Sequence, residues 1–266
     1  MSPRLLTAAI GAYPHTADLP GSDAVRLDRV AVSPINMAFA PMVRERRFDV
    51  SEMAIATFLM AKAAGIPITL LPVVMAARYQ EGALVCPQDS PIRGPADLKG
   101  KRVGVRAYSQ TTGMWLRGVL ADSHGVPPDS IAWTTFEDAH VPTFRDPPFV
   151  TRAAPGSDIA TMLRGGALDA AIFGFEVPAG MRTVFPDPAQ AGRDFQARYG
   201  FKPVNHLVVV KSELARDAAV MDGLRQVFAA SLTPREALAP AIALAGRFCA
   251  EQGLVAQPLT PEEVWS

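Results

Sequence analysis

The sequence predicts an α/β fold with largely parallel strands. Short apolar runs of strand length alternate along the chain with segments in which apolar residues recur at helical spacing. The chain has 266 residues, and 49% of them are hydrophobic, so it can bury a sizeable core. This length permits either one large domain or two lobes.

The first apolar runs predict strands at residues 5–10, 25–32, 48–50, 68–74 and 82–86. Ser51 follows the third run and is of a residue type that caps helices, so a helix is expected from there to Gly65. Glu52 would then lie in the first helical turn. It is either a surface acid that the helix dipole stabilises or an acid of the site.

A second series of strands and helices starts at residue 102. Strands are expected at 102–105, 170–173 and 207–210, and helices after Thr112, at 158–164 and at 188–199. Thr233 and Thr260 each precede a proline and stand three residues before a glutamate, which predicts capping boxes at two C-terminal helices. Residues 136–156 are rich in proline and lack a regular period, so they form either a lid over a ligand or a passive surface loop.

Composition excludes several classes of function. The 26 basic and 26 acidic side chains balance, so no nucleic-acid partner is expected. No apolar run approaches the roughly 20 residues that a membrane helix needs. The chain has no phosphate-binding or dinucleotide-binding glycine motif and no metal-spaced histidine pair, so neither a cofactor nor a metal is expected. Cys86 and Cys249 lie in apolar runs and are expected to be inert core thiols.

The N-terminal residues bear on cellular location. No export signal precedes the first apolar strand, which predicts a cytoplasmic protein, or a periplasmic one if the chain is a processed or cloned mature form. The expected partner is a small carboxylate, with no nucleic acid and no membrane. The sequence leaves a homo-oligomer open.

Polar side chains gather where predicted strands lead into helices. There the amides and the positive dipole end of a helix point to the crevice in which open α/β sheets bind small ligands. The turns at 49–52 and 173–178 are of this kind, and Gly174 would allow a close backbone approach. The longest such turn, after strand 102–105, carries Ser109, Gln110, Thr111 and Thr112. Its hydroxyls and amides suit a carboxylate or phosphate; a simple helix cap with solvated neighbours is the alternative.

Four histidines are candidates for proton transfer or capping. His15 follows the first predicted strand, at its carboxyl end. His206 precedes the last apolar strand, where an imidazole either satisfies a buried backbone group or faces the crevice. His124 is expected to close a helix, and His140 to be solvated within the loop.

Several segments together resemble the 4,5-dihydroxyphthalate decarboxylase family, whose fold is that of the type 2 periplasmic binding proteins. The phrase Arg47-Phe-Asp-Val-Ser-Glu-Met53 and the His206 that precedes the late apolar strand are the more particular features. The other matching segments are residues 100–105, 115–118, 166–172 and 205–210.

The resemblance implies two lobes with mixed sheets and a ligand in the cleft between them. Residues 1–90 and 205–266 would form the discontinuous first lobe, and residues 91–204 would form the second lobe before the chain crosses back. The polar turns would then face this cleft. Two stretches depart from the family pattern, which carries charged residues where this chain has Ala12, Pro14 and His15, and an arginine-histidine-serine run at residues 80–82.

The family resemblance implies a cofactor-independent decarboxylase of a hydroxylated aromatic or related small carboxylic acid, acting in aromatic acid catabolism. A non-catalytic solute-binding protein of the ABC-transporter type, specific for a small organic anion, is the alternative. The candidate proton donors or acceptors are His206, His15 and Glu81. The candidate substrate-binding residues are Tyr13, Ser51, Glu52, Arg78, Tyr108, Ser109, Gln110, Thr111, Thr112, Phe173 and Gly174, with Arg78 as the carboxylate partner.

Overall fold

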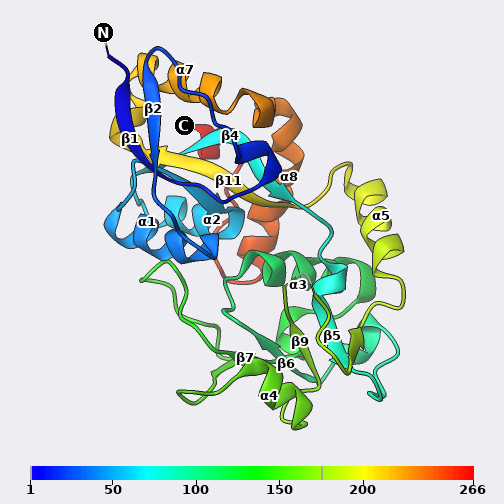
Figure 1. Ribbon diagram of the computed structural model, residues 1–266. Coiled ribbons are helices and arrows are strands. Elements are labelled where there is room, and N and C mark those ends of the chain that lie inside the picture. The colour runs from blue at the N-terminus through cyan, green and yellow to red at the C-terminus, as the bar shows by residue number, and fades with distance from the viewer. Residues whose placement is uncertain (1, 175) are drawn as a thin grey trace.

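The computed structural model describes residues 2–174 and 176–266, which form a five-stranded and a six-stranded sheet in two lobes (Figure 1). The first sheet has the order β2-β1-β3-β11-β4. Its strands are β1 (Arg4–Ala9), β2 (Val25–Arg29), β3 (Val50–Ala54), β4 (Ile68–Ala77) and β11 (Val204–Lys211). Strand β1 pairs in parallel with β2 and β3, whereas β11 runs antiparallel to β3 and β4.

The second sheet has the order β10-β5-β9-β6-β7-β8. Its strands are β5 (Leu84–Pro87), β6 (Arg102–Val105), β7 (Ala132–Thr135), β8 (Val150–Arg152), β9 (Ala170–Ile172) and β10 (Met181–Thr183). The pairs β6–β7, β7–β8 and β6–β9 are parallel, and β5 is antiparallel to β9 and β10. Both sheets are therefore mixed, as the predicted fold class requires.

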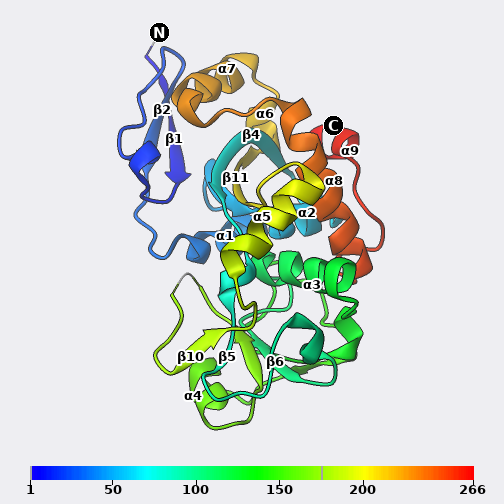
Figure 2. The same cartoon turned by 90° about the vertical axis from the view of Figure 1, so that its right-hand side faces the viewer.

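Helices cover both sheets and join the lobes (Figure 2). They are α1 (Phe39–Glu45), α2 (Ile55–Ala63), α3 (Thr111–His124), α4 (Ile159–Arg164), α5 (Pro188–Tyr199), α6 (Ser212–Ala215), α7 (Ala218–Val227), α8 (Arg235–Glu251) and α9 (Pro261–Trp265). Helix α8 packs against both α2 and α3. The approach to α3 is close, because a Cβ on Gly118 would lie 2.2 Å from the Phe248 ring. Among the described residues, no helix is long and apolar enough to cross a membrane.

The helix predicted to begin at Ser51 starts four residues later. Ser51 and Glu52 lie inside β3, which pairs with β1 on one side and β11 on the other and is buried along its whole length. Helix α2 begins at Ile55 without a side-chain cap. Strand pairing on both sides therefore overrides the capping preference of Ser51.

The two predicted capping boxes have different outcomes. Thr260 caps α9 as predicted, since its hydroxyl accepts from the Glu263 amide and the Glu263 carboxylate accepts from the Thr260 amide. Thr233 does not cap α8, which begins at Arg235 after Pro234.

The chain crosses between the sheets at residues 78–83, between β4 and β5, and again at 184–203, between β10 and β11. Strand β5 belongs to the second sheet, so the first crossing falls earlier than the boundary predicted at residue 90. The largest cluster of buried apolar side chains continues from one lobe into the other through α2, α3 and α8. This shared core fixes the position of one wall of the cleft relative to the other.

Candidate functional site

A cavity of about 290 Å³ lies between the lobes and collects polar groups from both of them. The first lobe contributes side chains beside β3, β4 and β11, and the second contributes the start of α3 and part of the loop after β7. The polar lining consists of Tyr13, Asn36, Thr57, Arg78, Arg106, Gln110, Thr111, Thr112, His140, Asn205 and His206. Phe39 and Ile35 add an apolar surface.

Glu52 is the buried carboxylate of this site. Antiparallel pairing puts Glu52 opposite Val208, so that His206, two residues along β11, lies on the same face of the sheet. Its Oε1 accepts hydrogen bonds from the Tyr13 hydroxyl and from His206 Nδ1, both at 2.6 Å. Its Oε2 accepts from the Gly11 amide at 3.0 Å. Three donors therefore converge on this one carboxyl group.

His206 is oriented by this carboxylate. An ionised carboxylate has no proton to donate, so Nδ1 carries the hydrogen and Nε2 is left for the cavity. The Phe39 ring lies edge-on to the imidazole, with centroids 5.1 Å apart, and limits its rotation. The Glu52 carboxylate stabilises the imidazolium that would form if Nε2 took up a proton.

Tyr13 supports the same carboxylate as a neutral phenol. Burial, followed by the hydrogen bond to Glu52 and its negative charge, raises the pKa of the Tyr13 hydroxyl well above its ordinary value. The hydroxyl therefore remains a hydrogen-bond donor at neutral pH, and it competes with His206 for Oε1 without adding charge.

The starts of two helices meet beside the cavity. Neither α2 nor α3 has a side-chain cap, and the Ala56 amide of α2 donates to the Thr111 hydroxyl of α3 at 3.2 Å. Arg78, which follows β4, donates from Nη2 to the Thr112 hydroxyl at 3.1 Å. Burial lowers the pKa of the Arg78 guanidinium, but its ordinary value is so high that the group stays charged. A guanidinium, hydroxyls and helix amides suit a carboxylate.

A second histidine lines the cavity from the loop after β7. His140 Nδ1 lies 2.9 Å from the Thr57 hydroxyl, and its ring stands edge-on to Phe39 at 5.7 Å. Burial lowers the pKa of His140 to about 4, helped by the charges of Arg106 and Arg44. This imidazole is therefore neutral at pH 7, unlike the solvated side chain that the sequence predicted.

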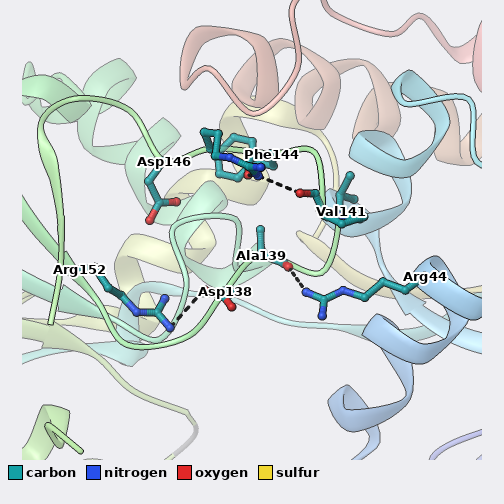
Figure 3. Close-up of a pocket in the computed structure, with 9 residues that line it drawn as sticks. Arg44, Asp138, Ala139, Val141, Phe144, Asp146 and Arg152 are labelled. Carbon is teal, nitrogen blue, oxygen red and sulfur yellow. Dashed lines mark hydrogen bonds and ion pairs between the residues drawn. The ribbon is translucent and has the colours of Figure 1, made fainter. Parts of the chain in front are cut away.

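Arg44 of α1 anchors the loop that carries His140. Its guanidinium donates to the carbonyls of Ala139 at 2.7 Å and His140 at 3.0 Å, as Figure 3 shows for Ala139. A larger cavity of about 480 Å³ lies on the outer side of this loop, beside Arg152 and Asp146. That cavity lacks the uncapped helix starts and the oriented histidine, so the smaller cavity is the better candidate for chemistry. The loop is a wall of the site, which favours the predicted lid over a passive loop.

The structure brings part of the predicted set together. Tyr13, Arg78, His206 and the residues 110–112 line the cavity, and Glu52 contacts it through Tyr13 and His206.

The other predicted catalytic residues lie elsewhere. His15 is exposed and stacks on the outer side of Tyr13, with centroids 5.2 Å apart. Glu81 is buried in the crossing between the lobes, where its Oε2 accepts from the Gln80 amide. Burial raises the pKa of the Glu81 carboxyl. Neither side chain lines the cavity.

The remaining predicted binding residues also lie outside the cavity. Ser51 is buried in β3 and donates to the Glu52 carbonyl, and Ser109 is buried without lining the cavity. The Tyr108 ring packs in the core against Trp133 and Phe149. Phe173 packs on a small apolar cluster of the second lobe, and Gly174 is exposed. Phe175, in the same predicted turn, lies outside the described residues.

Sequence reasoning missed several polar residues of the cavity. Arg106 follows β6 directly, and its position at a strand's carboxyl end was the available signal. His140, Thr57 and Asn205 are assembled by tertiary contacts, and only the irregular composition of residues 136–156 pointed to the first of them. Within residues 2–174 and 176–266, no cluster of three or more His, Cys, Asp or Glu side chains could hold a metal.

The two lobes and the cleft between them form an α/β fold shared with periplasmic binding proteins. A putative periplasmic sulfonate-binding protein from Methylobacillus flagellatus KT superposes with a TM-score of 0.52 at 10% identity, covering 99% of this chain and 91% of that one. The desulfurization enzyme DSZB superposes with the same TM-score at 15% identity, covering 98% and 95%. These similarities show the fold, which confirms the predicted class.

Sequence comparison finds relatives that are more similar to this chain than the solved structures are. Residues 36–151 match the family model described as NMT1/THI5 like. The chain is 28% identical over 247 residues to a 4,5-dihydroxyphthalate decarboxylase from Comamonas testosteroni, covering 84% of this chain and 73% of the relative. It is 30% identical over 135 residues to the protein of the same name from Pseudomonas putida, covering 48% and 51%. The predicted resemblance to 4,5-dihydroxyphthalate decarboxylases is therefore confirmed.

Proposed function

We propose that this protein is a cofactor-independent decarboxylase of a hydroxylated aromatic dicarboxylic acid related to 4,5-dihydroxyphthalate. The observation that carries the proposal is the Glu52–His206 pair in a cleft that also holds Arg78. The relatives named 4,5-dihydroxyphthalate decarboxylase support the same reaction class.

Decarboxylation requires two groups with different tasks, an acid that protonates the ring carbon and an anchor for the carboxylate that is retained. The bond between the ring carbon and the carboxylate breaks, its electron pair remains on the ring carbon, and carbon dioxide leaves. A proton must then reach that carbon, and ring hydroxyls make the carbon electron-rich enough to accept it. His206, protonated at Nε2 and stabilised by Glu52, delivers this proton, and a positioned acid of this kind contributes about 10²–10⁴-fold in rate.

The carboxylate that is retained needs a separate anchor. Arg78 and the Thr112 hydroxyl lie together at the start of α3 and supply this anchor. The neutral imidazole of His140 and the Thr57 hydroxyl suit a ring hydroxyl, because each can donate or accept a hydrogen bond. Phe39 lies edge-on to both histidines and offers an apolar surface to an aromatic ring.

Solute binding alone does not explain the buried acid. A protein that only binds an anion gains nothing from a carboxylate next to the site, since like charges repel. In a decarboxylase the same carboxylate has a role, because it stabilises the imidazolium that donates the proton. The Glu52–His206 pair therefore favours the enzyme over the solute-binding alternative.

The test measures carbon dioxide release from 4,5-dihydroxyphthalate, 4-hydroxyphthalate and phthalate by protein treated with EDTA and dialysed. We expect one carbon dioxide and one monocarboxylic acid per molecule of the hydroxylated substrate, and no release by His206→Gln. If all three acids bind but remain intact, the protein is a binding protein. If none binds, the cleft is not the site. Cellular location and oligomeric state stay predictions.

A further inference from the structure

Arg117 of α3 is a fully buried arginine outside the cavity. Its Nε donates to the Gln252 side chain at 2.8 Å and its Nη2 to the Tyr108 carbonyl at 2.5 Å. The guanidinium carbon lies 3.9 Å from the centre of the Tyr108 ring. Gln252 in turn donates to the Met114 carbonyl, so every direct hydrogen-bond partner of the cation is neutral.

This cation has no carboxylate partner among the described residues. Its Nη1 is buried without a hydrogen-bond partner there, and none of the ion pairs in that part of the chain includes it. Asp146 acts on it only from a distance, is exposed, and accepts from the Thr135 hydroxyl. Stacking on Tyr108 offsets part of the desolvation. An unpaired buried charge is otherwise strongly unfavourable, and burial accordingly lowers the pKa of Arg117.

The guanidinium also lies at the unfavourable end of its helix. It reaches back to the Tyr108 carbonyl, before the helix begins, and a Cβ on Gly113 would lie 3.0 Å from Nη1. The positive charge therefore sits beside the first turn of α3, where the helix dipole is also positive and a cation destabilises the helix. That same turn lines the cavity with Gln110, Thr111 and Thr112.

We propose that Arg117 is a positioning residue whose buried charge attracts a doubly charged ligand to the start of α3. An anion bound in the cavity then offsets this charge through space, without contacting it, and the bond to the Tyr108 carbonyl holds the turn in place. The uncompensated charge lowers the stability of the ligand-free protein. The same charge makes the site bind dianions more tightly than monoanions. This inference rests on the proposed function only in taking the cleft as an anion site, and it does not require decarboxylation.

The test compares ligands of different charge on variants that keep or remove the cation. Calorimetry measures the binding of phthalate, benzoate and neutral benzamide to the wild type, Arg117→Lys and Arg117→Met. For Arg117→Met we expect phthalate affinity to fall roughly tenfold more than benzoate affinity, with benzamide unchanged, since Coulomb energy scales with ligand charge. Arg117→Lys retains the charge and keeps the preference for phthalate.

Arg247→Met is the control, because this arginine of α8 has two carboxylate partners, Asp122 and Glu251. It should leave the charge preference unchanged. If Arg117→Met does not fold, Arg117→Gln replaces it, since a shorter amide can still bond to Gln252.

An equal loss for all three ligands would show a purely structural role and overturn the inference. So would a wild type that binds phthalate no more tightly than benzamide. A charge-selective loss in a protein that releases no carbon dioxide would support this inference while refuting the proposed decarboxylase.

Discussion

The two histidines of the cleft share one phenylalanine but have opposite surroundings. His206 on β11 contacts a buried carboxylate, whereas His140 on the loop contacts a hydroxyl and is flanked by Arg106 and Arg44. Phe39 stands edge-on to both rings. The second environment keeps the His140 imidazole neutral, because burial, helped by the charges of the two arginines, lowers its pKa.

This difference separates the tasks of the cleft. The Glu52–His206 pair of β3 and β11 prepares a proton donor, and Arg78 with the start of α3 provides charges and dipoles for an anion. Burial, helped by the charges of Arg106 and Arg44, keeps the His140 imidazole neutral, so that it does not compete for the proton.

Glu52→Gln should have the largest effect. The amide keeps the shape of the side chain but removes the charge that stabilises the His206 imidazolium, so we expect kcat to fall about 10²–10⁴-fold. The Kd for phthalate should not rise, because the change removes a like charge beside the anion. Steady-state kinetics and calorimetry measure both values, and Tyr13→Phe, which removes only one neutral donor from the same carboxylate, is the control. A kcat within a few fold of wild type would remove the pair from the chemistry.

Arg78→Ala should act on binding instead. Losing the guanidinium beside Thr112 is expected to weaken phthalate binding about 10–100-fold, because a charge-assisted hydrogen bond to the carboxylate is lost. Arg78→Lys should recover part of the affinity. Unchanged affinity in calorimetry would place Arg78 outside the anion site.

His140 should make stability depend on pH. Its folded pKa of about 4 lies below its ordinary value of 6.5, so the unfolded chain binds more protons between these values, and stability is lost as pH falls from about 6.5 towards 4. The full shift corresponds to about 3 kcal/mol, and partial contact with solvent reduces the expected loss to about 1–2 kcal/mol.

Urea unfolding of the wild type and of His140→Gln at several pH values measures this contribution. The variant should show a flatter dependence over that window. Equal slopes would mean that His140 is solvated after all.

Arg44→Ala should have the smallest effect. Removing the two bonds to the Ala139 and His140 carbonyls loosens the loop, which we expect to raise KM about 2–5-fold and to speed amide hydrogen exchange there. Arg152→Ala, which removes only an ion pair with the exposed Asp138 of the same loop, is the control. Similar exchange in both variants would show that Arg44 does not anchor the loop.

Local patterns predicted much of the fold. Strand β6, helix α5 and the cap of α9 lie where periodicity and capping residues placed them. The polar turn before α3 also lines the cavity from Gln110 onward. These features depend on contacts between residues close in the chain, which a single sequence displays directly.

The sequence by itself determined the α/β class, the polar start of α3 and the position of His206 beside the last apolar strand. Only the tertiary structure decided that Glu52 is the partner of His206, that Tyr108 belongs to the core and that His140 lines the cleft. Glu52 and His206 are 154 residues apart and meet through the register of β3 and β11. Such pairs depend on which strands become neighbours, and local propensity does not specify the neighbours of a strand.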